Sequence, residues 1–380
     1  MKILQVISYF NPKFGGDINI CTNLSKQLAK RNHEVTIITT DFSFDLQYAD
    51  MIRSEGIMVI PFPCVANFGR FIYSPSIKTW LEKNLMEFDV IHIHNYRSHQ
   101  NVAVRSFAMR YKIPYILQAH GTVLPLFEKL ILKKCFDVIW GNKILKNAAI
   151  CVALTKTESD QYEKMGVPEK KIVIIPNGID ISQYEDLPLR GQFRSKYQIP
   201  ENVRIILFLG RIHKIKGIDL LVSAFSQLCS QVRDVKLVIA GPDDGSLSQI
   251  QQQIRELQIE NDVLYTGPLY GKDKLEAYID ADVFVLPSRY EAFPNTILEA
   301  WACGTPVIAT KNCSISDVIR DTEESAVVDC DPVQMKEKIL DLLSNEEKRK
   351  KIGMKGKKLV QDNFEITKLV QKIEGIYETI

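Results

Sequence analysis

The sequence predicts an α/β protein built from two doubly wound domains, and three observations lead to this prediction. Short runs rich in Val and Ile alternate with longer amphipathic segments, which is typical of the βαβ units that form a parallel sheet. The alternation runs through the first half of the chain and starts again near residue 204. A chain of 380 residues with 46% hydrophobic residues is also too long for one ordinary core and too apolar to be disordered.

The expected strands are short and apolar, and segments with helical spacing, such as residues 18–31, lie between them. In the first half the strands cover residues 3–8, 34–40, 57–60, 89–93, 115–118, 149–153 and 172–175. In the second half they cover residues 204–209, 236–240, 263–265, 283–286 and 306–309. The last forty residues carry helical periodicity without a strand signal.

A polar stretch punctuated by proline separates the two halves. It follows the sequence PNGID at residues 176–180 and runs to Pro200, which indicates an interdomain connection. We therefore expect domains over residues 1–180 and 181–360, and a C-terminal helix over 361–380 that returns to the first domain. Ligands of doubly wound sheets bind at the carboxyl ends of the strands, so two such domains face to face would enclose a cleft.

The composition excludes several classes of function. Because 48 Lys and Arg balance 46 Asp and Glu to a net charge of +2, no global field favours nucleic acid as a partner. The eight cysteines include no pair at the spacing of a zinc or redox site. The apolar run at the N-terminus is too short for a signal peptide, and no long uncharged apolar run follows. We expect a cytoplasmic protein that binds no nucleic acid.

The most informative segment covers residues 287–301, where a buried strand ends and a helix is expected from about Asn295. Glu291 lies in the loop, and Glu299 lies about one turn into the helix. The free amides of residues 293–296 and the positive end of the helix dipole would suit a diphosphate, and Glu299 would accept hydrogen bonds from a ribose diol. Taken singly, Glu291 also fits a surface acid, and Glu299 a helix-start acid favoured by the dipole.

A pair of cations follows the first strand of the second half. The turn after residues 204–209 carries Gly210, Arg211 and Lys216 before the next helix. Arg grips phosphate through two parallel N–H bonds and Lys supplies a point charge, so the pair would neutralise a diphosphate leaving group without a metal ion. Taken alone, Lys216 fits a solvated loop lysine. Neither half contains a strict G-x-G-x-x-G, which argues against dinucleotide binding.

Two candidate features lie at strand ends of the first half. Gly15 and Gly16 follow the first strand, where they would let the backbone approach a ligand closely, although a flexible turn explains them equally well. His120 follows the strand over 115–118 and is expected to face the ligand, where an imidazole can bond a sugar hydroxyl. A purely structural role for His120 is the alternative.

Two patterns resemble metal sites. His92, His94 and His99 together with His120 suggest a cluster, but no carboxylate or cysteine stands at ligand spacing nearby. The D-x-D sequence at residues 280–282 lies where a helix leads into a buried strand, and we interpret it as coincidental. We therefore expect no metal.

Residues 127–146 mix apolar side chains with lysines. An amphipathic helix of this composition can lie on an anionic membrane. An ordinary packed helix with a solvated lysine face is the alternative.

Taken together, these motifs resemble the family-4 retaining glycosyltransferases of the GT-B fold, also described as glycosyl transferases group 1. The resemblance covers essentially the whole chain and implies two Rossmann-like domains that face a central cleft. It rests on an ordered set of motifs: Gly15-Gly16, His120-Gly121, residues 177–180, Gly210-Arg211, Lys216-Gly217, and Glu291 with Glu299. Ala292 departs from the pattern, because many relatives carry glycine there.

The resemblance implies a role for each matching residue of the second domain. Arg211 and Lys216 match the cations that bind the donor diphosphate. Glu299 matches the acid that holds the ribose hydroxyls, and Glu291 matches the acid that contacts the donor sugar. The backbone amides of Phe293, Asn295 and Thr296 would line the sugar and phosphate.

In the first domain the resemblance implies that His120 lies near the transferred sugar and that Gly16 packs against donor phosphate or acceptor. The catalytic groups are expected to be His120, Glu291, Arg211 and Lys216. The donor-binding residues are expected to be Gly15, Gly16, Gly210, Arg211, Lys216, Glu291, Phe293, Asn295, Thr296 and Glu299. No metal and no other cofactor is implied.

We therefore expect a retaining, metal-independent hexosyltransferase that uses a UDP- or GDP-sugar as the donor of a hexose or N-acetylhexosamine. The acceptor would be a hydroxyl of a glycan, a lipid-linked molecule or a small molecule, and the enzyme would work in the cytoplasm or at the inner face of the cell membrane in surface polysaccharide or glycolipid synthesis. The alternatives are a nucleotide-sugar epimerase or hydrolase of the same fold, and a non-catalytic nucleotide-sugar binding protein.

Overall fold

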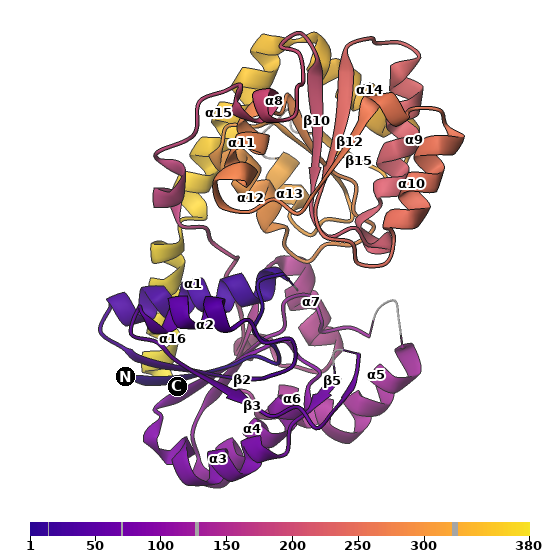
Figure 1. The fold of residues 1–380 in the computed structure, drawn as a ribbon. Coiled ribbons are helices and arrows are strands. Elements are labelled where there is room, and N and C mark those ends of the chain that lie inside the picture. The colour runs from indigo at the N-terminus through magenta and orange to yellow at the C-terminus, as the bar shows by residue number, and fades with distance from the viewer. Residues whose placement is uncertain (14, 70, 126–128, 321–325) are drawn as a thin grey trace. The chain divides into compact units, whose positions relative to one another are not determined.

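The computed structural model describes residues 1–13, 15–69, 71–125, 129–320 and 326–380. The chain divides into two compact units, of which unit 1 comprises Met1–Gly178 with Ile366–Ile380 and unit 2 comprises Ile179–Glu365. Each unit contains a parallel sheet with helices on both of its faces (Figure 1). The last helix, α16 (Ile366–Thr379), therefore belongs to unit 1 although it ends the chain.

The sheet of unit 1 has seven strands in the order β3-β2-β1-β6-β7-β8-β9, and every neighbouring pair is parallel. The strands are β1 (Lys2–Val6), β2 (Glu34–Thr40), β3 (Met58–Phe62), β6 (Val90–His94), β7 (Tyr115–Gln118), β8 (Ile150–Ala153) and β9 (Ile172–Ile174). The direction of strand succession reverses between β1 and β6. In doubly wound sheets this switch point, at the carboxyl ends of the strands, is where ligands bind.

Successive side chains of these strands point to opposite faces, and each face carries its own apolar cluster. One cluster packs under α1 (Gly16–Lys30), α2 (Leu46–Arg53) and α16, and the other under α3 (Ser76–Asn84), α4 (His99–Tyr111), α6 (Asn142–Asn147) and α7 (Lys156–Lys164). The unit also contains α5 (Leu130–Phe136) and an antiparallel hairpin of β4 (Ala66–Phe68) and β5 (Phe71–Tyr73). Glu374 of α16 accepts hydrogen bonds from Arg31 Nε and His33 Nε2, both at 2.7 Å, which ties α16 to the end of α1.

The sheet of unit 2 has six parallel strands in the order β12-β11-β10-β13-β14-β15. They are β10 (Arg204–Leu209), β11 (Val235–Ala240), β12 (Val263–Gly267), β13 (Val283–Leu286), β14 (Val307–Thr310) and β15 (Ala326–Val328). The helices are α8 (Gln192–Lys196), α9 (Ile218–Cys229), α10 (Leu247–Glu256), α11 (Gly271–Asp280), α12 (Asn295–Ala302), α13 (Ser316–Arg320), α14 (Pro332–Ser344) and α15 (Glu346–Asn363). Here the switch point lies between β10 and β13, so the loops after these two strands are the expected ligand edge.

The structure confirms every strand predicted from the sequence to within a few residues. It adds the β4–β5 hairpin and β15, whose strands are only three residues long. β9 is equally short but was predicted, because it continues a run of four Ile and Val residues over 172–175, whereas β4, β5 and β15 lie in no such run.

Candidate functional site

Arg211 lies in the turn that follows β10, at the switch point of unit 2. This turn pairs with the turn after β11, because Ile212 N–H donates a hydrogen bond to Pro242 O at 2.8 Å and Asp244 N–H donates to Ile212 O at 3.0 Å. Gly210 N–H also donates a hydrogen bond to Ala240 O at 3.0 Å, so the pairing of the two turns continues the pairing of β10 with β11. The Arg211 guanidinium forms an ion pair with Asp244, and both side chains are partly exposed. An anion in solvent can therefore reach the guanidinium and compete with Asp244.

Lys216 ends a short 3₁₀ turn, Lys214–Lys216, and Gly217 follows it in the left-handed region at φ 67°. A Cβ atom on Gly217 would lie 2.1 Å from Pro287 O, so only glycine lets this turn pack against the loop after β13. That close approach brings Lys216 into an ion pair with Glu291. The structure thus joins two residues that the sequence places 75 positions apart.

Glu291 is fixed by its own backbone. Its N–H donates to Asn312 O at 3.2 Å, and its carbonyl accepts from Ser314 N–H at 2.8 Å, which ties it to the loop after β14. Four residues later α12 begins at Asn295, and among the described residues no side chain caps its N-terminus. The first turn of α12, with Asn295 and Thr296, therefore presents the positive end of the helix dipole close in sequence to Glu291.

The ring of Phe293 packs into unit 2, so only its backbone is left for the predicted contact with a donor. The side chain is buried, and its ring lies 5.9 Å from the ring of Phe364.

Glu299 is held by two donors from α11. Lys274 Nζ donates to one carboxylate oxygen at 2.8 Å, and the Tyr278 hydroxyl donates to the other at 3.1 Å. Tyr278 is buried, and burial together with the adjacent Glu299 carboxylate raises the pKa of its hydroxyl well above the usual value. Tyr278 therefore remains a hydrogen-bond donor, and the orientation of Glu299 is set before any ligand binds.

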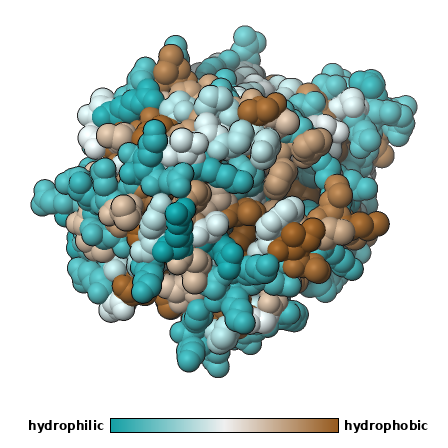
Figure 2. Space-filling model, turned by 90° about the horizontal axis from the view of Figure 1, so that it is seen from below, coloured by the Kyte–Doolittle hydropathy of each residue, from teal (hydrophilic) through white to brown (hydrophobic). Residues whose placement is uncertain are grey.

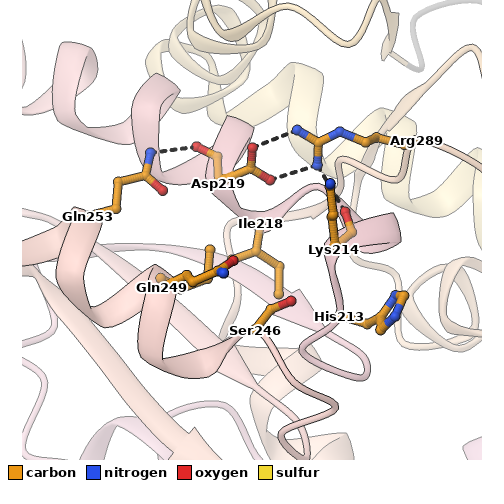
Figure 3. A pocket seen from close by; sticks show the side chains of 9 residues that line it. His213, Lys214, Ile218, Asp219, Ser246, Gln249, Gln253 and Arg289 are labelled. Carbon is orange, nitrogen blue, oxygen red and sulfur yellow. Dashed lines mark hydrogen bonds and ion pairs between the residues drawn. The ribbon is translucent and has the colours of Figure 1, made fainter.

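Arg289, just after β13, braces the turn that carries Lys216 (Figure 3). Its guanidinium donates to both carboxylate oxygens of Asp219 at 2.7 and 2.6 Å and to Lys214 O at 2.9 Å. Its own N–H donates to Ile215 O at 2.8 Å. The four bonds hold the 3₁₀ turn against the start of α9.

A cavity of about 230 Å³ lies beside this brace and is lined by residues of the turn, α9 and α10 together with Arg289 (Figure 3). Lys214 lines it, whereas Arg211, Lys216, Glu291 and Glu299 do not. This cavity is therefore separate from the predicted donor-binding residues.

In unit 1 the loop after β1 leads to α1. Gly15 is the N-cap of α1, which begins at Gly16, and a Cβ on Gly15 would lie 2.6 Å from Asp17 Oδ1. The other oxygen of Asp17 accepts hydrogen bonds from the Tyr9 hydroxyl at 3.0 Å and from Asn95 Nδ2 at 2.8 Å. These bonds join the loops that follow β1 and β6, the two strands at the switch point of unit 1.

His120 follows β7 in a left-handed turn, at φ 51°, with Gly121 at φ 80°. Such a conformation is strained for a residue other than glycine, and the surroundings must hold it. Glu158 does so, because its carboxylate accepts from Gly121 N–H at 2.6 Å and from Leu154 N–H at 2.8 Å. Burial raises the pKa of Glu158 to about 7.

The His120 ring lies 2.9 Å from the His94 ring, measured from Nε2 to Nδ1. Burial lowers the pKa of His120 to about 4, that of His92 to about 3, and that of His94 well below its usual value. All three imidazoles are therefore neutral near pH 7. Within the described residues, no group of three or more His, Cys, Asp or Glu side chains is arranged to hold a metal ion.

The carboxylates of the D-x-D sequence are buried among structural partners. Asp280 accepts from Gly191 N–H at 2.5 Å and from Arg194 N–H at 2.9 Å, and Asp282 accepts from Ile205 N–H at 2.9 Å. They join α8 to β10 and are not displayed at the ligand edge.

Several residues of this arrangement escaped the sequence analysis: Asp244, Lys274, Tyr278, Arg289 and Glu158. Lys274 and Tyr278 stand four apart, a spacing that places both on one face of a helix. Asp244 lies in a Gly-containing turn after a strand. Those signals exist in the sequence, but nothing local says which carboxylate or cation each residue meets.

Two family models match the chain, one for each half. The model described as Glycosyltransferase Family 4 matches residues 14–183, and the model described as Glycosyl transferases group 1 matches residues 190–359. The chain belongs to glycosyltransferase family 4. This glycosyltransferase has the GT-B fold, with two Rossmann-like domains.

The matched relatives extend over nearly the whole chain. This glycosyltransferase is 26% identical to N-acetyl-alpha-D-glucosaminyl L-malate synthase of Bacillus anthracis over 377 aligned residues. The alignment covers 96% of this chain and 94% of the relative. It is 27% identical over 333 residues to alpha-monoglucosyldiacylglycerol synthase of Streptococcus pneumoniae, in an alignment that covers 84% of this chain and 74% of the relative. Among solved structures, HepE of Anabaena in complex with UDP and glucose superposes with a TM-score of 0.85 at 18% identity, covering 100% of both chains.

Proposed function

We propose that this glycosyltransferase moves a hexose or N-acetylhexosamine from a UDP- or GDP-sugar to a hydroxyl acceptor, with retention of the anomeric configuration and without a metal ion. The observation that carries the proposal is the pair of cations at the switch point of unit 2, Arg211 and Lys216, each of which is paired with a carboxylate. Two relatives support it, since the names of the Bacillus anthracis and Streptococcus pneumoniae enzymes describe glycosyl conjugates. The HepE structure holds UDP and glucose, which supports a nucleotide-sugar donor.

Donor binding would proceed by exchange of ion-pair partners. A diphosphate carries more negative charge than a single carboxylate, so it competes with Asp244 for Arg211 and with Glu291 for Lys216. The amides at the start of α12 add a second source of positive potential. Once Lys216 turns to the phosphate, the Glu291 carboxylate becomes available to accept hydrogen bonds from the hydroxyls of the donor sugar.

The chemical step would then depend on stabilising the leaving group. Negative charge develops on the diphosphate as the bond to the sugar breaks, and preorganised cations and amides lower the energy of that state. The acceptor hydroxyl would attack from the side on which the diphosphate leaves, and Glu291 would orient the sugar. Glu299 would hold the ribose, because each of its oxygens has one donor and retains capacity to accept another hydrogen bond.

A thermal-shift screen against UDP-, GDP- and ADP-sugars tests the donor, since a ligand that binds only the folded state raises its melting temperature. We expect a UDP- or GDP-sugar to stabilise the protein, and no shift with any nucleotide sugar would contradict the proposal. NMR of the product formed with the identified donor then reports the anomeric configuration, and an inverted product would refute retention. Full-rate release of free sugar without acceptor would indicate a hydrolase.

We propose in addition that unit 1 binds an anionic membrane through the surface of residues 129–146, here called the basic apolar surface. Phe127, included in the sequence prediction, lies outside the described residues. The surface consists of α5, the π-helical turn Asp137–Gly141 and α6. Its exposed apolar side chains are Leu130, Ile131, Leu132, Val138, Ile139 and Trp140, and its exposed lysines are Lys129, Lys134, Lys143 and Lys146.

The arrangement of these side chains favours a lipid surface over a solvated helix. Ile131 and Val138, which are 78% and 74% exposed, stand seven residues apart, about two helical turns. The one acid within residues 129–146, Asp137, is buried and paired with Arg97, so it does not offset the lysines. In the space-filling view from below, brown hydrophobic residues lie between teal hydrophilic residues on the surface (Figure 2). Within the described chain no helix is long and apolar enough to cross a membrane, so the contact would be peripheral.

Flotation with phospholipid vesicles tests this contact. We expect the protein to float with vesicles that contain phosphatidylglycerol and to float less with pure phosphatidylcholine. The variant Ile131→Ser/Val138→Ser should abolish flotation, whereas Met354→Ser, which changes a similarly exposed apolar residue in unit 2, should not. Equal flotation of both variants would contradict the assignment.

A further inference from the structure

Three imidazoles form a column at the ligand edge of unit 1. His92 and His94 lie two apart on β6 and therefore share a face of the sheet, with ring centroids 4.4 Å apart and planes 12° apart. The ring of His120 lies edge to edge with that of His94, with centroids 5.2 Å apart and planes 10° apart. The column ends at the left-handed turn that Glu158 holds, so its last member is the one nearest the loop.

Two hydrogen bonds link Gln5, His94 and His120 in one direction. His92 Nδ1 pairs instead with the Tyr377 hydroxyl at 2.7 Å. Gln5, on β1, places its carbonyl oxygen Oε1 2.7 Å from His94 Nε2, and His94 Nδ1 lies 2.9 Å from His120 Nε2. A carbonyl oxygen only accepts, so His94 carries its proton on Nε2. A neutral imidazole has one N–H and one lone pair, so His94 Nδ1 must accept and His120 Nε2 must donate.

The remaining nitrogen of His120 is then a bare acceptor. His120 Nδ1 is buried, and within the described part of the chain it has no hydrogen-bond partner. Buried polar atoms in folded proteins are nearly always satisfied, so an atom left without a partner calls for a ligand that supplies one. The missing partner must be a donor, which excludes a carbonyl or a phosphate oxygen and fits a hydroxyl.

We infer that Gln5 and His94 are positioning residues that fix His120 as the tautomer protonated on Nε2, so that His120 Nδ1 accepts a hydrogen bond from a sugar hydroxyl. The inference rests on the proposed function for the identity of the hydroxyl. It does not depend on Arg211 or Lys216, which belong to the other unit. The orientation of the Gln5 amide sets the direction of both hydrogen bonds. An amide turned to present Nε2 to His94 would reverse the Gln5–His94 bond and the His94–His120 bond.

Nitrogen-15 NMR of the histidine rings reads the tautomer directly, because a protonated ring nitrogen and a bare one have very different shifts. In the wild-type chain we expect His120 to be protonated on Nε2 and bare on Nδ1. Gln5→Leu removes the acceptor for His94 Nε2 and should mix the two tautomers of His120. A proton on His120 Nδ1 in the wild type would overturn the inference.

Kinetics then separate positioning from a merely structural role. His94→Phe keeps a ring but removes the acceptor, and we expect kcat to fall about 10- to 100-fold, the usual range for a residue that orients a working imidazole. His94→Asn returns an acceptor near the position of Nδ1 and should recover most of that loss. In a His120→Ala background, His94→Phe should have no further effect, because it would act only through His120. Additive losses in the double variant would contradict the inference.

The two proposals fail in distinguishable ways. If no nucleotide sugar binds the wild-type protein, the proposed function fails while the tautomer of His120 remains measurable. If the donor binds and is consumed but His120→Ala works at the wild-type rate, only the role of the hydroxyl contact is lost.

Discussion

Both sheets reverse their strand order at a switch point, but the side chains at the two switch points differ in charge. At the edge of unit 2, Arg211 and Lys216 are charged and each meets a carboxylate that an anion can replace. At the edge of unit 1, His94 and His120 are neutral and are joined by hydrogen bonds that leave one acceptor atom open. In the proposed function, the charged residues would meet a diphosphate and the neutral acceptor would meet a hydroxyl.

The largest expected effect is at the charged edge. Lys216→Ala and Arg211→Ala should each lower kcat/KM for the donor about 100- to 1,000-fold, because each removes a charge that stabilises the leaving diphosphate. Lys214→Ala is the matched control, since this lysine lies in the same turn but lines the separate cavity. Steady-state kinetics with the donor found by the screen measures the effect. Wild-type turnover in Lys216→Ala, or an equal loss in Lys214→Ala, would remove the distinction between the two lysines.

The neutral edge makes unit 1 sensitive to acid. The pKa values of His92, His94 and His120 are lowered from 6.5 by burial, so the stability they contribute is present above pH 6.5 and is lost as the pH falls. Each histidine adds a slope of about 1.4 kcal/mol per pH unit between 6.5 and its folded pKa. Glu158 acts in the opposite sense, because its raised pKa of about 7 favours the folded state as the pH falls from 7 towards 4.5. Because three histidines outweigh one glutamate, the free energy of unfolding of unit 1 should fall below pH 6.

Hydrogen exchange at pH 6.5 and pH 5, corrected for the intrinsic rate, measures this separately in each unit. We expect β1, β6 and β7 to lose protection at pH 5, while β10 and β13 keep it. Equal losses in both sheets would show that the acid sensitivity does not come from the histidine column.

A smaller effect should follow from loosening the brace behind Lys216. Asp219→Asn removes one of the two charge-assisted bonds from Arg289, and we expect kcat/KM to fall roughly 10-fold, since such a bond contributes about 1.5 kcal/mol or more. The melting temperature of the variant, taken alongside the kinetics, distinguishes a displaced turn from general unfolding. An unchanged kcat/KM would show that Lys216 does not need the brace.

The smallest effect should be at the packing of α16 on α1. Glu374 pairs with Arg31 and His33, and these partners lower its pKa, so its contribution to stability is present above pH 4.5 and is lost on further acidification. Because Arg31 is largely solvated, Glu374→Gln should lower the melting temperature by only a few degrees at neutral pH. Donor kinetics should be unchanged, and a large loss of activity would contradict a purely structural role.

Local signals in the sequence were sufficient for most of the fold. The alternation of apolar runs predicted the strands of both sheets, and the starts of α9 and α12 followed from the turns before them. The β4–β5 hairpin and β15 were missed because their three residues belong to no longer apolar run, unlike those of the equally short β9. The motifs of the candidate site could likewise be recognised from short segments of the sequence, because each motif follows the carboxyl end of one strand.

The partners of those motifs could not be predicted. Lys216 meets Glu291 because Gly217 allows two loops to touch, and Glu299 meets Lys274 across two helices. The same limit applies in unit 1, where the sequence predicted no metal cluster of His92, His94, His99 and His120 but could not show which side chains His94 contacts. The structure places Gln5 and His120 on either side of His94, and the contact of three separate strand ends determines the chemistry of the column.

Donor binding as proposed requires Lys216 to exchange Glu291 for the donor diphosphate. Calorimetric titration of UDP and GDP into the wild type, Lys216→Ala and Lys214→Ala tests it without any acceptor. The wild type and Lys214→Ala should bind one of the two nucleotides with the same Kd, and Lys216→Ala should bind it at least about 10-fold more weakly, as expected for the loss of a charge-assisted contact. Equal Kd values for all three proteins would contradict the claim.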